Sequence, residues 1–135
     1  MQIVVASGNI FRRELTSYIL SEAGYCVSEA RDLAGLLAAL VGSTPLAMIV
    51  DAQLLRAGAG TAGSPLPQRS DIPLLWIATP GHEPLPAEAG GRPSDQVAWP
   101  FRPESLLERL AALLARVKGG LLEGAPSERL AGPAE

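Results

Sequence analysis

One aspartate stands out among the residues whose position suggests chemistry. Asp51 directly follows the apolar run LAMIV (Leu46–Val50), which is typical of a strand buried on both faces of a parallel sheet. A carboxylate at the C-terminal end of such a strand lies where α/β sheets bind their ligands. Asp51 is therefore a candidate ligand-binding residue, and the alternative is an aspartate that only caps the turn after the strand.

Two other patterns suggest chemistry but lack the necessary context. The segment Gly58–Gly63 reads GAGTAG and matches the letters of the dinucleotide-binding fingerprint. That function needs the first glycine at a strand end and a helix beginning at the third, whereas Pro65 follows here, so nucleotide binding is not expected. His82 lies in a proline-rich loop without a second histidine or cysteine nearby, so no metal site is expected there.

The elements that must position Asp51 follow from the hydrophobic patterns. Five strands are predicted at 3–6, 25–28, 46–50, 74–78 and 96–99. Helices are predicted at 10–23, with an apolar stripe of Phe11, Leu15, Tyr18, Ile19 and Ala23, at 33–42 after the cap Asp32, and at 105–117 before Gly119 and Gly120. The alternation indicates an open α/β fold with a parallel sheet.

Two of the crossover segments lack the pattern of a helix. Segments 52–72 and 80–95 together hold six prolines and six glycines, so they are expected to cross the sheet as loops or short turns, with a helical turn possible only at 53–57 and 86–89. Residues 121–135 have the composition of a linker. The sequence thus predicts one domain at 1–120, with an eroded third and fourth crossover helix, and a flexible tail or linker at 121–135.

Composition excludes several classes of function. The net charge of −3 gives no electrostatic footprint for nucleic acid or an anionic membrane. No apolar run is long enough to span a bilayer, and the N-terminus lacks the basic region of a signal peptide. The single cysteine, Cys26, excludes an internal disulfide and is expected to be a small apolar filler in a strand. These features predict a cytoplasmic protein.

The order of elements resembles the receiver domains of two-component response regulators over residues 2–118. The resemblance rests on five segments, which are Gln2–Leu15, Pro45–Asp51, Asp71-Ile72-Pro73 followed by LLWIAT, Trp99-Pro100-Phe101 and Pro103–Leu107. It implies a flavodoxin-like, doubly wound five-stranded parallel sheet of order 2-1-3-4-5. It also implies that Asp51 is the phosphoacceptor and that the Trp99-Pro100 bond is cis.

The sequence departs from the receiver pattern at the positions that carry its chemistry. The acid pair that holds Mg²⁺ falls on Ser7 and Gly8, and the lysine falls on Trp99. The switch hydroxyl falls on Ala78, with Thr79 one place late. Phosphoryl transfer to a carboxylate needs its charge neutralised. Mg²⁺ is therefore expected to bind weakly or not at all, and no other cofactor is expected.

These departures predict a degenerate receiver domain, a non-enzymatic signalling or scaffolding module that binds a protein partner or itself. One alternative is a working phosphoacceptor that uses Asp51 without the usual acids; another is a flavodoxin-like small-molecule binder. Loops at 52–72 and 80–95, with only Leu54, Leu55, Leu66 and Leu85 as large apolar residues, are expected to leave sheet surface near Trp76 open. A homodimer or partner interface is therefore predicted on that side, away from Asp51; the alternative is that the loops fold down and seal this face.

Overall fold

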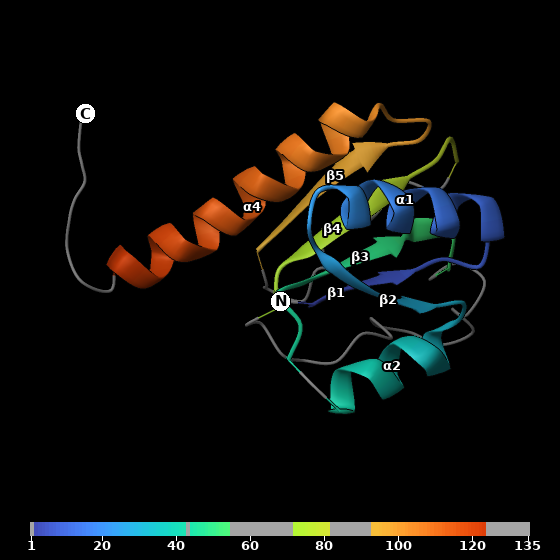
Figure 1. Ribbon diagram of the computed structural model, residues 1–135, viewed down its shortest axis with the longest axis horizontal. Coiled ribbons are helices and arrows are strands. Elements are labelled where there is room, and N and C mark those ends of the chain that lie inside the picture. The colour runs from blue at the N-terminus through green and yellow to red at the C-terminus, as the bar shows by residue number, and fades with distance from the viewer. Residues whose placement is uncertain (1, 43, 55–71, 82–92, 124–135) are drawn as a thin grey trace.

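The computed structural model shows a five-stranded, all-parallel sheet with helices on both faces (Figure 1). It describes residues 2–42, 44–54, 72–81 and 93–123. The elements are β1 (Gln2–Ala6), α1 (Ile10–Glu22), β2 (Cys26–Ala30), α2 (Leu33–Gly42), β3 (Ala47–Asp51), β4 (Leu74–Ala78), β5 (Ser94–Ala98) and α4 (Pro103–Glu123). The strand order is β2-β1-β3-β4-β5, as the resemblance implied.

The core has two layers because successive side chains of a strand point to opposite faces of the sheet. Along β3, Ala47 and Ile49 face α1 and α4, while Met48 and Val50 face α2. All five residues of β3 and of β4 are buried, which explains their continuous apolar runs. Helices α1 and α4 lie on one face and α2 lies on the other, as right-handed crossovers require (Figure 1).

The start of α2 and the end of α1 follow local sequence signals. The side chain of Asp32 accepts a hydrogen bond from the Gly35 N–H at 2.8 Å and caps α2. After α1, the Gly24 N–H donates to the Ser21 carbonyl and the Tyr25 N–H donates to the Leu20 carbonyl. These two bonds form a Schellman motif, and Gly24 adopts its left-handed conformation with φ of 99°.

We expect Gly24→Ala to lower the free energy of unfolding by about 1 kcal/mol, because a Cβ is disfavoured at positive φ. The cost is conformational, since nothing lies within 4 Å of an added Cβ. Gly24→Asn is the matched control and should lose less, because asparagine tolerates this conformation. Urea unfolding of the three proteins measures the difference, and equal losses for both variants would contradict the assignment.

Several predicted boundaries are wrong. Strand β2 runs from Cys26 to Ala30 and β5 from Ser94 to Ala98, so Trp99, predicted as the last residue of the fifth strand, lies just outside it. Helix α4 continues through both glycines to Glu123, so the first three residues of the predicted tail are helical. Two glycines cost a helix about 2 kcal/mol, which weakens it without forcing an end. Residues 124–135 lie outside the described part.

Three predictions about burial are also wrong. Phe11 and Tyr18 of the predicted apolar stripe are exposed, and Thr16 and Ser17 are buried instead. Cys26 is exposed, because β2 is an edge strand. Trp76 is only 3% exposed, because it belongs to a buried cluster with side chains of α2 and with Leu54 and Ile72. The sheet surface near Trp76 is therefore covered.

The remaining predictions about the crossovers lie mostly outside the described residues. These include GAGTAG, His82, Leu55, Leu66 and Leu85, and with them the erosion of two helices. Within the described part, residues 52–54 are helical, which agrees with the predicted turn after β3. No helix of the described part is long and apolar enough to cross a membrane.

Candidate functional site

The candidate site lies at the carboxyl edge of the sheet, where β1 and β3 end side by side. Asp51 is the last residue of β3, and Ser7 directly follows β1. Both are fully buried, although both are polar. A buried carboxylate needs hydrogen bonds and a positive charge to offset its lost hydration. The residues around Asp51 supply both.

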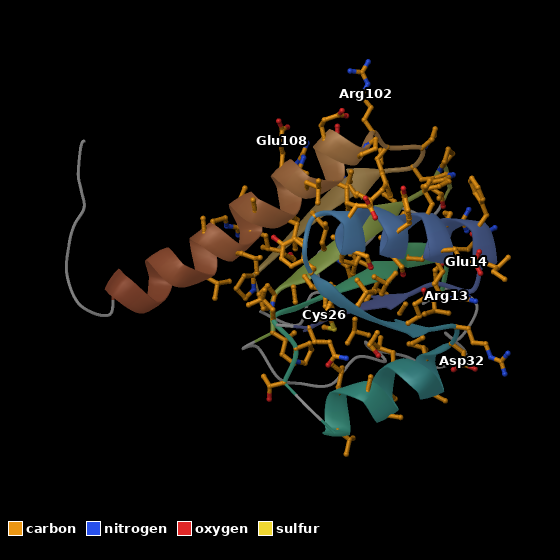
Figure 2. All side chains as sticks on the ribbon, in the orientation of Figure 1. Arg13, Glu14, Cys26, Asp32, Arg102 and Glu108 are labelled. Carbon is orange, nitrogen blue, oxygen red and sulfur yellow. The ribbon has the colours of Figure 1, made fainter. Side chains whose placement is uncertain are left out.

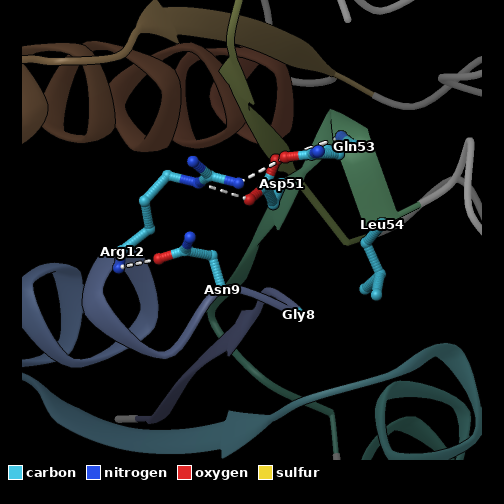
Figure 3. A pocket seen from close by; sticks show the side chains of 6 residues that line it. All are labelled: Gly8, Asn9, Arg12, Asp51, Gln53 and Leu54. Atoms are coloured by element: carbon cyan, nitrogen blue, oxygen red, sulfur yellow. Dashed lines mark hydrogen bonds and ion pairs between the residues drawn. The ribbon is translucent and has the colours of Figure 1, made fainter.

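Both oxygens of the Asp51 carboxylate are engaged (Figure 3). One, Oδ2, accepts hydrogen bonds from the Ser7 hydroxyl and from Nε of Arg12, each at 2.8 Å. The other, Oδ1, accepts the backbone N–H of Gln53 at 3.0 Å. The Arg12 side chain is 13% exposed and that of Asp51 is 1% exposed, so the two form a largely buried ion pair.

Arg12 reaches Asp51 because of how α1 begins. Asn9 is the N-cap of α1, and its side chain accepts the Arg12 N–H at 2.9 Å. This places Arg12 in the first helical turn, from which its side chain extends to Asp51 and Gln53 (Figure 3). A second nitrogen of Arg12 donates to the side-chain oxygen of Gln53. The guanidinium thus binds both Asp51, at the end of β3, and Gln53, two residues later.

Trp99 packs beside Arg12 at this edge of the sheet. Its ring contacts Phe11 at a centroid distance of 5.9 Å and Phe101 at 5.1 Å, both edge to face. The guanidinium carbon of Arg12 lies 5.9 Å from the centroid of the Trp99 ring. The Trp99-Pro100 bond is cis, as the resemblance implied. An aromatic cluster therefore stands beside the ion pair.

Ala78 and Thr79 end β4 near the same edge. The Ala78 carbonyl accepts the Trp99 N–H at 2.8 Å, so the strand end helps to hold the tryptophan. The Thr79 hydroxyl is buried and has no partner among the described residues. Neither residue belongs to the lining of the pocket at Asp51. That pocket has a volume of about 270 Å³ and is lined by Gly8, Asn9, Arg12, Asp51, Gln53 and Leu54.

Comparison with known proteins identifies the architecture. No family model matches the sequence, and no curated protein matches it. The receiver domain of NtrX from Brucella abortus matches the structure with a TM-score of 0.66 and 22% identity, over 84% of this chain and 98% of that one. The chemotaxis response regulator CheY4 of Vibrio cholerae matches with a TM-score of 0.62 and 24% identity, over 83% and 97%.

The chain has the receiver fold. A longer NtrX chain from Brucella abortus also matches, with a TM-score of 0.72 and 21% identity, over 98% of this chain and 31% of that one. At these identities the likeness establishes the architecture and not the chemistry of the site.

The residues at this edge do not fit the magnesium ion that the receiver pattern implies. Mg²⁺ requires octahedral oxygen ligands and is usually held by one or two carboxylates. Here Ser7 and Gly8 contribute no carboxylate, and the guanidinium of Arg12 already lies on Oδ2 of Asp51. In the described part of the chain, no group of three or more acidic, histidine or cysteine side chains is placed to hold a metal.

The structure brings the predicted Asp51, Ser7, Gly8 and Trp99 to one edge of the sheet, together with residues that sequence reasoning did not name. The missed residues are Asn9, Arg12 and Gln53. One signal was available, because an N-cap asparagine three residues before an arginine puts that arginine in the first turn of the helix. The first turn after β1 lies at the same edge as Asp51, so a cation there is within reach of the carboxylate.

Proposed function

We propose that this receiver-fold domain is a signalling module that works through protein contacts, without phosphorylation of Asp51. The engagement of both Asp51 oxygens carries the proposal. An aspartate must offer an oxygen lone pair to an incoming phosphoryl group, in line with the leaving group. In this domain Ser7, Arg12 and the Gln53 N–H use three of the roughly four lone-pair positions of the carboxylate, which is fully buried.

The charge around Asp51 also supports the proposal. Arg12 already neutralises the Asp51 carboxylate in the unphosphorylated protein. The guanidinium charge is therefore not free to stabilise the phosphoryl oxygens in a transition state. Trp99 offers no ammonium group in place of the receiver lysine. Loss of one stabilising group of about 3 kcal/mol slows a reaction by more than a hundredfold. We also propose that the domain is cytoplasmic and that it binds Mg²⁺ weakly or not at all.

The pocket gives little support to the alternative of a small-molecule binder. Its volume of about 270 Å³ falls below the range of about 300–1,000 Å³ that is usual for ligand sites. Its polar lining residues, Asn9, Arg12, Asp51 and Gln53, are bonded to one another. A ligand would have to displace a buried ion pair to use them.

We expect no phosphorylated Asp51 after incubation with acetyl phosphate and Mg²⁺. Intact-mass spectrometry at neutral pH detects the adduct, and a receiver domain with a complete acid pair and lysine controls for the reagent. Asp51→Asn separates modification of this residue from modification elsewhere. A labile phosphate adduct that disappears in Asp51→Asn would assign the domain to the working phosphoacceptors and end the proposal.

A further inference from the structure

Helix α2 contains no polar side chain. Its ten residues, Leu33–Gly42, read LAGLLAALVG. Leu36 and Leu40 are buried in the cluster that α2 forms with the sheet, so they fix which side of the helix faces inward. The opposite side carries four apolar residues, which we call the α2 stripe: Ala34, Leu37, Ala38 and Val41.

The α2 stripe lies at the surface although it has the pattern of a packed face. Its residues are spaced at i, i+3, i+4 and i+7, which places them along one side of the helix. Val41 is 88% exposed, Ala34 and Ala38 are also exposed, and Leu37 is half-buried. A surface helix normally has a polar outer side, and a helix that is apolar all round is normally buried. The composition of α2 thus fits a helix that is covered on both sides.

The α2 stripe carries no charge, and the two charges at its N-terminal end have opposite signs. Arg31 and Asp32 precede the helix, and Asp32 caps it through the Gly35 N–H. In Figure 2, Asp32 lies at the start of α2, and the side chains that α2 directs away from the sheet are carbon only. On β2, Cys26 and Ser28 face the same side of the sheet as α2 and are uncharged.

The α2 stripe is also complementary to itself in size. When two such helices lie antiparallel and are centred between Leu37 and Ala38, Ala38 of each copy faces Leu37 of the other. In the same register, Ala34 of each copy faces Val41 of the other. A small residue therefore meets a larger one at every position, which is how facing helices fill the space between them. A parallel pair would place alanine against alanine and leave gaps.

We propose that the α2 stripe is the contact surface between two copies of this chain, paired antiparallel about a twofold axis. A twofold contact brings a surface against itself, so a charge on it would meet its own like. The neutral stripe avoids that repulsion, and the antiparallel arrangement puts opposite ends of the two helix dipoles side by side. A different protein fits less well, because a neutral surface offers no charge by which one partner would be selected.

The contact is small, so the dimer is weak. A helix of ten residues is about 15 Å long, and two of them in contact bury less than the roughly 1,200 Å² at which stable interfaces begin. We expect a dissociation constant of about 0.1 mM. The inference rests on the proposed function in taking protein contact as the output of the domain. Its failure is distinguishable, because self-association and phosphorylation are measured separately.

The test is sedimentation velocity of the 135-residue chain between about 0.01 and 1 mM, where the average mass should rise toward that of a dimer. Ala38→Glu and Ala38→Lys each place two like charges beside the axis and should weaken association by about tenfold or more. An equal mixture of the two variants should associate again, because opposite charges then face each other. Ala38 is exposed, so both variants should unfold at nearly the parent's urea midpoint.

The matched control is Ala112→Glu, the same substitution at an exposed alanine of α4, which should associate like the parent. A parent that stays monomeric over the whole concentration range would overturn the proposal. So would unchanged association of Ala38→Glu, or a mixture of Ala38→Glu and Ala38→Lys that stays monomeric. Loss of association in Ala112→Glu would also overturn it, because the two copies would then meet through α4.

Discussion

Arg12→Met is expected to lower the free energy of unfolding by about 3 kcal/mol, because it leaves Asp51 buried without a cation. Methionine keeps most of the apolar stem and removes the charge. In the variant, the Ser7 hydroxyl and the Gln53 N–H still donate to the carboxylate, but nothing neutralises it. A denaturant titration followed by circular dichroism gives the change directly.

Two further variants separate the buried pair from a general effect of losing an arginine. Arg109→Met removes the partner of Asp95, but these side chains are 54% and 27% exposed, so a loss within about 1 kcal/mol is expected. Arg12→Met combined with Asp51→Asn removes both charges and should cost less than Arg12→Met alone. If the double variant is the less stable one, the two residues do not act as a compensating pair.

Most of the fold could be predicted from the sequence because the patterns of two central strands indicate strands buried on both faces. The runs LAMIV and LLWIA are apolar at every position, which suits a strand covered on both faces. They placed Asp51 at the end of β3, and the resemblance then supplied the strand order. The edge strands β2 and β5 are less apolar, and their predicted boundaries shifted for that reason.

The faces of α1 could not be assigned from periodicity alone. Residues 11, 15 and 18 form a stripe with helical spacing, and so do residues 16 and 20 on the opposite side. A hydrophobic pattern does not say which stripe meets the sheet when small polar residues such as Thr16 and Ser17 fit the closer contact. The structure buries the second stripe and leaves Phe11 and Tyr18 of the first exposed.

Only part of the Asp51 site could be predicted, because a sequence pattern does not say which way a helix faces. The resemblance to the receiver pattern predicts which groups are absent at Ser7, Gly8 and Trp99, but it cannot predict what replaces them. Arginine on a helix is normally read as a solvated residue, so Arg12 carried no signal by itself. Its role depends on the rotation of α1 relative to β3, which the Asn9 cap sets.

Restoring the receiver lysine is expected to damage the protein rather than repair it. Trp99→Lys removes two edge-to-face contacts, with Phe11 and Phe101, each worth about 0.5–1.5 kcal/mol. It also removes the ring that faces Arg12 and puts a second cation beside that guanidinium. We expect the free energy of unfolding to fall by about 2–3 kcal/mol, whereas Trp99→Phe, which keeps a ring, should lose less.

The same variant tests what blocks phosphorylation. If the missing lysine were the sole obstacle, Trp99→Lys would gain a labile adduct with acetyl phosphate and Mg²⁺. We expect none, because Ser7, Arg12 and the Gln53 N–H still occupy both oxygens of Asp51. Intact-mass spectrometry on folded Trp99→Lys, with its fold verified by circular dichroism, distinguishes the two cases. An adduct would show that the ion pair yields to an incoming phosphoryl group, and that Trp99 alone silences the domain.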